Sequence, residues 1–154
     1  YEQFSVGQRF EHVLRRTVTE ADNLIFSALT HNPAALHLDE EYMKSSEFGT
    51  RIVNSCFTLS LMVGVSVADT TLGTTIANLG WDEVRLPNPV FEGDTLYSQS
   101  EVLEKRESKS RPDVGIVKVR TTGFNQDGKT VIGFIRTVMV FKRGKAPVMP
   151  RPTP

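Results

Sequence analysis

The stretch from residue 56 to residue 69 restricts the possible folds of this chain more than any other. Asn54 or Ser55 can cap a helix here, which we expect to run to about Asp69. Its apolar residues cover nearly every face: Cys56, Phe57, Leu59, Leu61, Met62, Val63, Val65, Val67 and Ala68. Such a helix is predicted to be buried, and it is too short to span a bilayer. The rest of the chain must therefore cover it.

The pattern changes to strands after residue 74. The predicted strands cover residues 75–79, 82–86, 95–105, 114–124 and 130–142. Asn125-Gln-Asp-Gly128 predicts the hairpin turn between the last two. One apolar helix followed by antiparallel strands predicts an α+β fold in which a sheet wraps around a central helix. A sheet edge then stays free to meet another copy, so a homodimer is a hypothesis at this point.

A strand and two short helices are predicted before the central helix. Residues 8–18 alternate in part and favour a strand. Thr19 can cap a helix that ends near Thr30, before Asn32-Pro33, with an apolar stripe of Leu24, Ile25, Ala28 and Leu29. Asp39 can cap a second helix that runs to Ser45.

Length and charge place the chain among ordinary globular domains. Its 154 residues suit one domain over 1–143, and four prolines in 144–154 indicate an extended tail. The 18 basic and 18 acidic side chains cancel, which argues against a dedicated nucleic-acid binder.

The single cysteine and the N-terminal residues bear on location. One cysteine excludes an intrachain disulfide and fits a reducing compartment, and Cys56 is expected to be a core thiol. The first residues lack the basic and apolar run of a signal peptide. We expect a cytoplasmic protein with no membrane segment.

The densest functional signal is the segment from His31 to Asp39, which holds two imidazoles and an amide around a proline. His37 can act as a general base or acid because imidazole titrates near neutrality, and Asn32 can hold a water or a carbonyl. A polar loop with a hydrogen-bonded histidine is the alternative interpretation. No metal is expected, because the two histidines lack the spacing and the further ligands of a zinc site.

A second signal is Arg51-Ile-Val-Asn54-Ser55 at the start of the apolar helix. A helix N-terminus presents unpaired N–H groups and a positive dipole end, which can stabilise a developing oxyanion. An ordinary helix cap is the alternative. A third signal, Leu86 to Leu96, contains two prolines and a tight turn, and by itself it carries no chemistry.

The chain resembles the MaoC-like dehydratases, also called (R)-specific enoyl-CoA hydratases. The resemblance rests on three motifs in this order: N-P…H-L-D, R-I-V-N-S and P-V-F-E-G-D-T-L. The resemblance covers residues 5–143. It implies a single hot-dog domain, a homodimer or higher homo-oligomer, and hydration of a 2-enoyl-CoA thioester or the reverse dehydration. Coenzyme A then enters only as part of the substrate, and no other cofactor is expected.

The resemblance also assigns site residues. His37 matches the catalytic histidine, while Asn32 stands where the family has an aspartate, so two proton-handling groups become one. Ser55 stands where the family has a glycine whose N–H binds the thioester oxygen, and Asn54 replaces a histidine. His31 is the nearest candidate for the missing proton-handling group.

Three further stretches, 71–75, 77–81 and 89–96, are similar to relatives that hydrate mesaconyl-CoA or itaconyl-CoA. Arg51 or Arg85 can then pair with the second carboxylate of such a substrate, although a structural arginine is the alternative for each. A hot-dog acyl-CoA thioesterase is a second hypothesis, weakened by the lack of a carboxylate at the helix start. A non-catalytic acyl-CoA-binding subunit is a third, motivated by Asn32.

Overall fold

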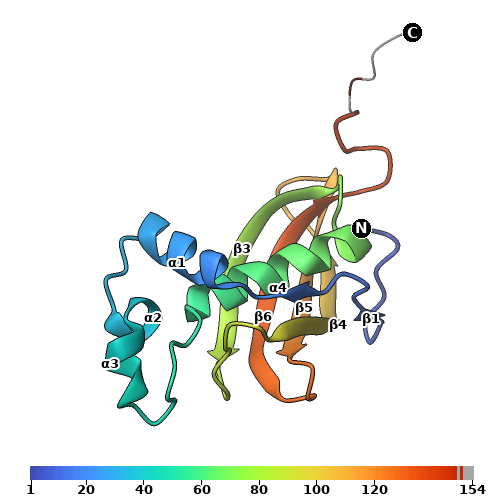
Figure 1. The fold of residues 1–154 in the computed structure, drawn as a ribbon. Coiled ribbons are helices and arrows are strands. Elements are labelled where there is room, and N and C mark those ends of the chain that lie inside the picture. Colours follow the sequence, from blue (N-terminus) through green and yellow to red (C-terminus); the bar gives the residue numbers. More distant parts are fainter. Residues whose placement is uncertain (149, 151–154) are drawn as a thin grey trace, which may run out of the picture.

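An antiparallel sheet with one long helix across its face forms the body of the molecule (Figure 1). The computed structural model describes residues 1–148 and 150. The strands are β1 Arg9–Glu11, β2 Arg16–Thr17, β3 Thr75–Arg85, β4 Thr95–Glu107, β5 Val114–Phe124 and β6 Thr130–Phe141. The helices are α1 Glu20–Leu29, α2 Ala35–Leu38, α3 Glu40–Lys44 and α4 Ser55–Thr70. This arrangement confirms the predicted α+β class.

The sheet follows the strand order β1-β4-β5-β6-β3, with β2 paired to β4. Side chains from β4, β5 and β6 build two apolar clusters. Leu96, Ile132 and Phe134 belong to the cluster that includes Met62 of α4, and Val138 belongs to the cluster that includes Phe4. The core therefore lies between the sheet and a cover made of α4 and the N-terminal segment.

The bounds of the long strands agree most closely with those predicted from the sequence. The strand over 114–124 has its predicted bounds, and β4 and β6 differ from prediction only at their ends. The two pieces predicted at 75–79 and 82–86 are one strand, β3, with three register irregularities. The strand predicted over 8–18 is instead two short strands, because residues 12–15 leave the sheet between β1 and β2.

The β5–β6 turn confirms the predicted hairpin. The Asn125 side-chain oxygen accepts hydrogen bonds from the backbone N–H groups of Asp127 and Lys129, each at 3.1 Å. Gly128 follows with φ +74°, a left-handed conformation that glycine adopts without a steric penalty. An asparagine side chain that closes its own turn thus fixes the register of β5 and β6.

Helix α4 confirms the predicted bounds and cap but not the predicted burial on all faces. The Asn54 side chain accepts a 3.0 Å hydrogen bond from the Cys56 N–H. Only one side packs on the sheet, where Thr58, Met62, Val65 and Ser66 are buried. The opposite side is an exposed stripe of Cys56, Ser60, Gly64 and Ala68. The prediction of a core cysteine is therefore wrong, because a single sheet covers a single side of the helix.

Helix α1 has its predicted cap, but its apolar stripe is not its buried side. Thr19 and Asp22 form a reciprocal capping box. Ile25 is 59% exposed and Leu29 76% exposed, whereas Asn23 and Ser27 are buried. The helix turns a polar edge inward, and Ile25 and Leu29 of the predicted apolar stripe lie on its exposed side.

Of the two short helices that follow α1, the sequence pattern predicted one. Asp39 caps α3 through a 2.9 Å hydrogen bond from the Tyr42 N–H, as predicted. Helix α2 was not predicted, because a single turn without a side-chain cap has no periodic signature.

A buried histidine ties the N-terminal segment to the end of α4. The His12 ring lies 3.1 Å from an Asp69 carboxylate oxygen through Nδ1 and 2.8 Å from the Ser100 hydroxyl through Nε2. The same ring stacks on Phe10. A buried imidazole with both nitrogens hydrogen-bonded is a structural crosslink among β1, β4 and α4.

Part of the tail prediction cannot be compared with the structure, since residues 149 and 151–154 lie outside the described residues. Among the helices of the described part of the chain, none has the length and apolar character needed to cross a bilayer.

The close contact between β5 and α4 gives a test of the core. A Cβ at Gly123 would lie 2.6 Å from the Met62 sulfur and 2.8 Å from Ile132 Cγ2, both fully buried. We expect Gly123→Ala to lower the free energy of unfolding by about 1–3 kcal/mol, since the core cannot yield. Urea denaturation measures this. Gly133→Ala, where nothing lies within 4 Å of the new Cβ, is the matched control and should leave stability unchanged.

Candidate functional site

A cavity of about 480 Å³ opens at the N-terminal end of α4, within the size range of ligand pockets. It lies between the start of α4, the segment before it and the proline-rich segment that leads toward β4. Most of its walls are apolar: Phe48, Ile52, Val53, Ser55, Thr58, Leu86, Pro87, Asn88, Pro89 and Val90. Two of the three sequence motifs thus form one cavity.

Ser55 places the first turn of α4 at this cavity. It is the first residue of α4 and lines the wall. The first N–H groups of a helix have no acceptor within the helix, and the helix dipole adds partial positive charge there. The start of α4 can therefore stabilise negative charge on an oxygen bound in the cavity.

His37 lies next to the same cavity. It is a buried residue of the short helix α2, and its Nδ1 lies 2.8 Å from the carbonyl oxygen of Ile52, a wall residue. A carbonyl oxygen only accepts, so Nδ1 carries a proton, and in the neutral imidazole Nε2 then has the lone pair. This tautomer gives His37 one nitrogen that can accept a proton.

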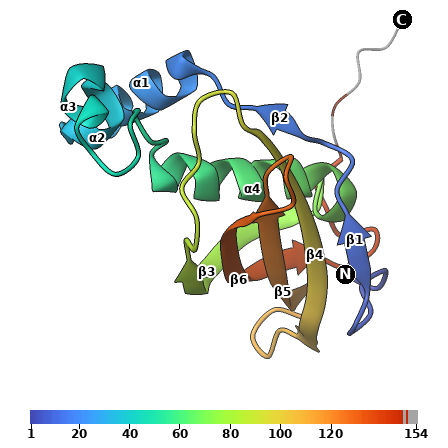
Figure 2. The same cartoon turned by 60° about the horizontal axis from the view of Figure 1, so that its bottom comes forward.

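Asn23, which the sequence analysis did not single out, holds these parts together. Its amide donates to the carbonyl oxygens of His37 and Ile52, each at 3.2 Å, and its oxygen accepts from the Asn54 N–H at 2.9 Å. The side chain is fully buried. One amide thus joins α1, α2 and the entry to α4, which Figure 2 shows gathered at one end of that helix.

The remaining predicted residues of the His31–Asp39 loop lie apart from one another. The Asn32 side chain accepts a 3.0 Å hydrogen bond from the Ala34 N–H, and no hydrogen bond among the described residues joins it to His37. His31 is exposed with φ +53°, and it does not line the cavity. The structure thus gives Asn32 a turn-forming contact and leaves His31 outside.

Asn54 is engaged in the scaffold. Its side-chain oxygen caps α4, and its amide nitrogen donates to the Ser27 hydroxyl at 3.2 Å. A buried side chain with both ends hydrogen-bonded to the protein supports the cap interpretation over the predicted substrate contact.

Arg51 is surrounded by carboxylates. Its guanidinium bonds Glu20 at 2.5 Å, Glu40 at 3.1 Å and Glu92 at 3.4 Å, and the side chain is 12% exposed. The hydrogen bond with Glu20 and the nearby carboxylate charges outweigh burial and raise the pKa of Arg51 above its ordinary value. The Nε and one terminal nitrogen of Arg51 thus donate to three glutamates, which supports the structural alternative over the predicted substrate contact.

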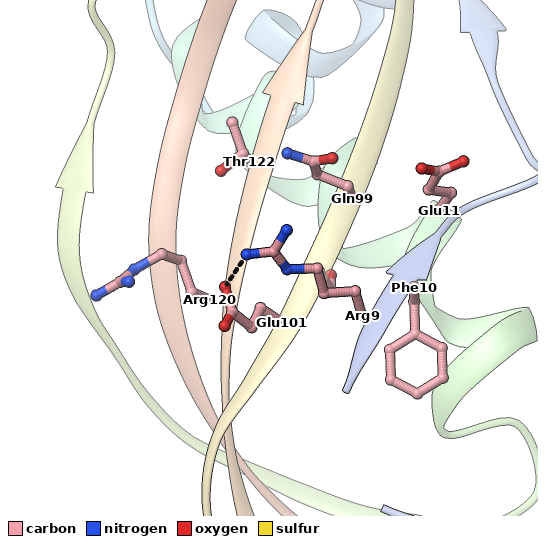
Figure 3. A pocket seen from close by; sticks show the side chains of 8 residues that line it. Arg9, Phe10, Glu11, Gln99, Glu101, Arg120 and Thr122 are labelled. Atoms are coloured by element: carbon pink, nitrogen blue, oxygen red, sulfur yellow. Dashed lines mark ion pairs between the residues drawn. The ribbon is translucent and has the colours of Figure 1, made fainter. Parts of the chain in front are cut away.

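Arg85 also lies away from the cavity. It is exposed, and it borders a shallow hollow on the face of the sheet opposite α4, with Glu83, Arg120 and Thr122. Arg120 and Thr122 also border the neighbouring hollow of about 190 Å³ shown in Figure 3, where Arg9 pairs with Glu101. This charged face contains none of the predicted catalytic residues.

Comparison with known proteins identifies the family. The model of the MaoC like domain matches residues 2–124, most of the chain. The chain belongs to the MaoC-like family. It is 35% identical to a mesaconyl-CoA hydratase of Cereibacter sphaeroides, covering 99% of this chain and 44% of that protein. It is 28% identical to an (R)-specific enoyl-CoA hydratase of Rhodospirillum rubrum, covering 94% of this chain and 93% of that protein.

The fold comparison agrees. A conserved hypothetical protein of Mycobacterium tuberculosis, described as having a double hot-dog fold, matches with TM-score 0.83 at 21% identity, over 96% of this chain and 46% of that one. The predicted hot-dog fold is thereby confirmed. This MaoC-like chain spans less than half the length of the mesaconyl-CoA hydratase and of the double hot-dog protein.

The contacts of Asn23 give a test of the site's scaffold. Asn23→Leu keeps the size of the side chain but leaves the His37 carbonyl and the Asn54 N–H without their partner, and it removes one of the two donors to the Ile52 carbonyl. We expect the free energy of unfolding to fall by about 1–3 kcal/mol, since unpaired buried polar groups are costly. Urea denaturation followed by circular dichroism measures the loss. Gln3→Leu changes an exposed amide and serves as the control. Equal stability of both variants would contradict the scaffold role of Asn23.

Proposed function

We propose that this chain catalyses the hydration of a 2-enoyl-CoA thioester to a 3-hydroxyacyl-CoA, or the reverse dehydration. The observation that carries the proposal is a buried histidine of fixed tautomer beside a cavity that also meets the N-terminus of α4. A base and an oxyanion donor at one apolar cavity suit addition to a polarised double bond. The names of the relatives support the same reaction.

The proposed steps use few groups. His37 Nε2 takes a proton from water as the oxygen adds to C3 of the enoyl group, while Asn32 orients that water. The electron pair of the double bond moves toward the thioester oxygen, where the Ser55 N–H stabilises the negative charge. His37 then returns the proton to C2. No atom is gained or lost beyond the water, and coenzyme A serves only as part of the substrate.

The acyl group is proposed to be short. The mesaconyl-CoA hydratase relative supports a methyl-branched, dicarboxylic acyl group, and the apolar walls suit the methyl branch. No lysine or arginine is among the described residues that line the cavity. The second carboxylate of a dicarboxylic substrate would therefore meet only hydroxyl and amide groups of this chain. Because no cation compensates its charge, we expect crotonyl-CoA, which has no second carboxylate, to be hydrated at least as fast as mesaconyl-CoA.

A homodimer located in the cytoplasm is part of the proposal.

Replacing His37 tests the reaction. His37→Ala removes the only proposed proton-handling group, so kcat on crotonyl-CoA and mesaconyl-CoA should fall at least about a hundredfold. Loss of enoyl absorbance in the ultraviolet measures hydration. His31→Ala, which changes an exposed histidine of the same loop, is the matched control.

The same assays distinguish the alternative functions. Release of free CoA without double-bond loss would assign a thioesterase, and tight binding of acyl-CoA without turnover would assign a binding subunit.

Replacing Asn32 tests the missing carboxylate. Asn32→Asp keeps the oxygen that accepts from Ala34 and adds a second group able to carry a proton. We expect kcat/KM to rise about tenfold, less than the roughly 100- to 10,000-fold that a fully positioned acid or base contributes, and the pH–rate profile to gain an acidic limb. A fall in kcat/KM with unchanged thermal stability would mean that the amide itself is needed to hold the water.

A further inference from the structure

A buried hydroxyl lies in the wall of the cavity at the start of α4. Thr58 lines this cavity together with Ser55, and it is only 1% exposed. Most of the other wall residues are apolar, and the side-chain amide of Asn88 already donates to the Thr130 carbonyl oxygen at 2.8 Å. Among the described residues of the wall, Thr58 therefore supplies the one buried side-chain hydroxyl.

This hydroxyl forms no hydrogen bond with any described residue. The backbone N–H of Thr58 donates to the Asn54 carbonyl oxygen at 3.2 Å, but the side chain has no such partner. Ser66, the other buried hydroxyl residue of α4, donates to the Val63 carbonyl oxygen at 2.7 Å. A hydroxyl within a helix can thus satisfy itself on the preceding turn, and Thr58 does not. Its hydroxyl stays free for a molecule bound in the cavity.

Packing alone does not explain a threonine at this position. Buried polar side chains are normally hydrogen-bonded, because a buried hydroxyl without a partner has lost its contacts with water. Valine has nearly the same shape as threonine and would fill the space of Thr58 without that cost. The chain instead places a hydrogen-bond donor where an apolar side chain would be more stable, which is typical of a residue that acts on a ligand.

Helix geometry directs the hydroxyl toward the start of α4. Residues three positions apart lie on the same side of a helix, with Cβ atoms about 5–6 Å apart. Each Cα–Cβ bond of a helix is tilted toward the N-terminus, so the side chain of Thr58 leans back toward Ser55. Both residues border the cavity. The Ser55 N–H and the Thr58 hydroxyl therefore face the same part of it.

We propose that the Thr58 hydroxyl is a second hydrogen-bond donor to the thioester oxygen, beside the Ser55 N–H. The inference rests on the proposed function and adds a catalytic residue to it. Negative charge grows on the thioester oxygen as the electron pair of the double bond moves toward it, so both hydrogen bonds strengthen in the transition state. The hydroxyl proton stays on Thr58 throughout, and the balance of the proposed hydration is unchanged.

The number of donors at the helix start favours this assignment. A thioester oxygen has two lone pairs, and one backbone N–H occupies only one of them. The next N–H of α4, that of Cys56, already donates to the side-chain oxygen of Asn54 at 3.0 Å. The Thr58 hydroxyl borders the cavity and has no other acceptor among the described residues, so it can occupy the second lone pair.

Thr58→Val tests the role in catalysis, since it removes the donor and keeps the shape. We expect kcat on crotonyl-CoA to fall about a hundredfold, at the lower end of the effect of removing one oxyanion donor. KM should change much less, because the lost interaction is strongest in the transition state. Thr58→Ser keeps the hydroxyl and should retain most of the activity. Thr122→Val makes the same change on the opposite face of the sheet and is the matched control.

Two further measurements distinguish a donor to the substrate from a structural hydroxyl. Thr58→Val should melt at the same temperature as the wild type or higher, since it breaks no hydrogen bond within the folded chain. Bound 2,4-hexadienoyl-CoA should absorb at a longer wavelength than the free thioester, because hydrogen bonds to its oxygen draw electron density along the conjugated acyl group. This shift should be smaller in Thr58→Val and retained in Thr58→Ser.

The spectral shift needs no turnover, so it separates this inference from the proposed function. Equal kcat and an equal shift in the wild type and Thr58→Val would overturn the role of Thr58 and leave the reaction standing. A wild type that hydrates no enoyl-CoA, but has a shift that Thr58→Val reduces, would support the donor and overturn the reaction. A lower melting temperature of Thr58→Val would assign the hydroxyl to the fold, and a wild type without a shift would have no polarising donors; either result would overturn the inference.

Discussion

The hydrogen bonds of the Asn23 amide are the constraint on which the site depends. The side chain reaches three backbone groups that belong to α2, to the segment before α4 and to the cap of α4. An amide is the side chain that can donate twice and accept at one position without charge. A leucine there would satisfy the helical pattern of α1 but would leave the base and the oxyanion donor without a fixed separation. The inverted burial of α1 is the consequence of this requirement.

A second set of contacts holds the same region from its outer side. Arg51 links Glu20 of α1, Glu40 of α3 and Glu92 of the segment before β4. Burial works to raise the pKa of Glu40, but hydrogen bonds from Thr50 and Arg51 outweigh it and lower that pKa. Glu92 also accepts from Asn23 at 3.4 Å. The proline-rich motif, which carries no chemistry of its own, thus acts on the site through one carboxylate.

The sequence patterns predicted the elements whose causes are local. The Asn125 turn, the Thr19 and Asp39 caps and the alternation in residues 114–124 depend on neighbours within a few positions, and each was found where expected. The patterns failed where the partner is distant in sequence. Asn23 and Arg51 contact residues far along the chain, so nothing in a short window marks them as structural. The exposed side of α4 was not predicted for a related reason. A run of apolar and small residues indicates that a helix can be buried on all faces, but it does not indicate what covers each face.

A single proton-handling nitrogen also fixes the stereochemistry of the proposed reaction. The carbonyl of Ile52 holds the proton on His37 Nδ1, so only Nε2 faces the reacting atoms in the proposed steps. The same nitrogen then removes a proton from water and delivers one to C2. One ring position cannot reach both faces of a planar enoyl group held in a cavity, so water and proton must add to the same face. In the proposed steps, syn addition follows because one ring nitrogen handles both protons, and Asn32 only orients the water.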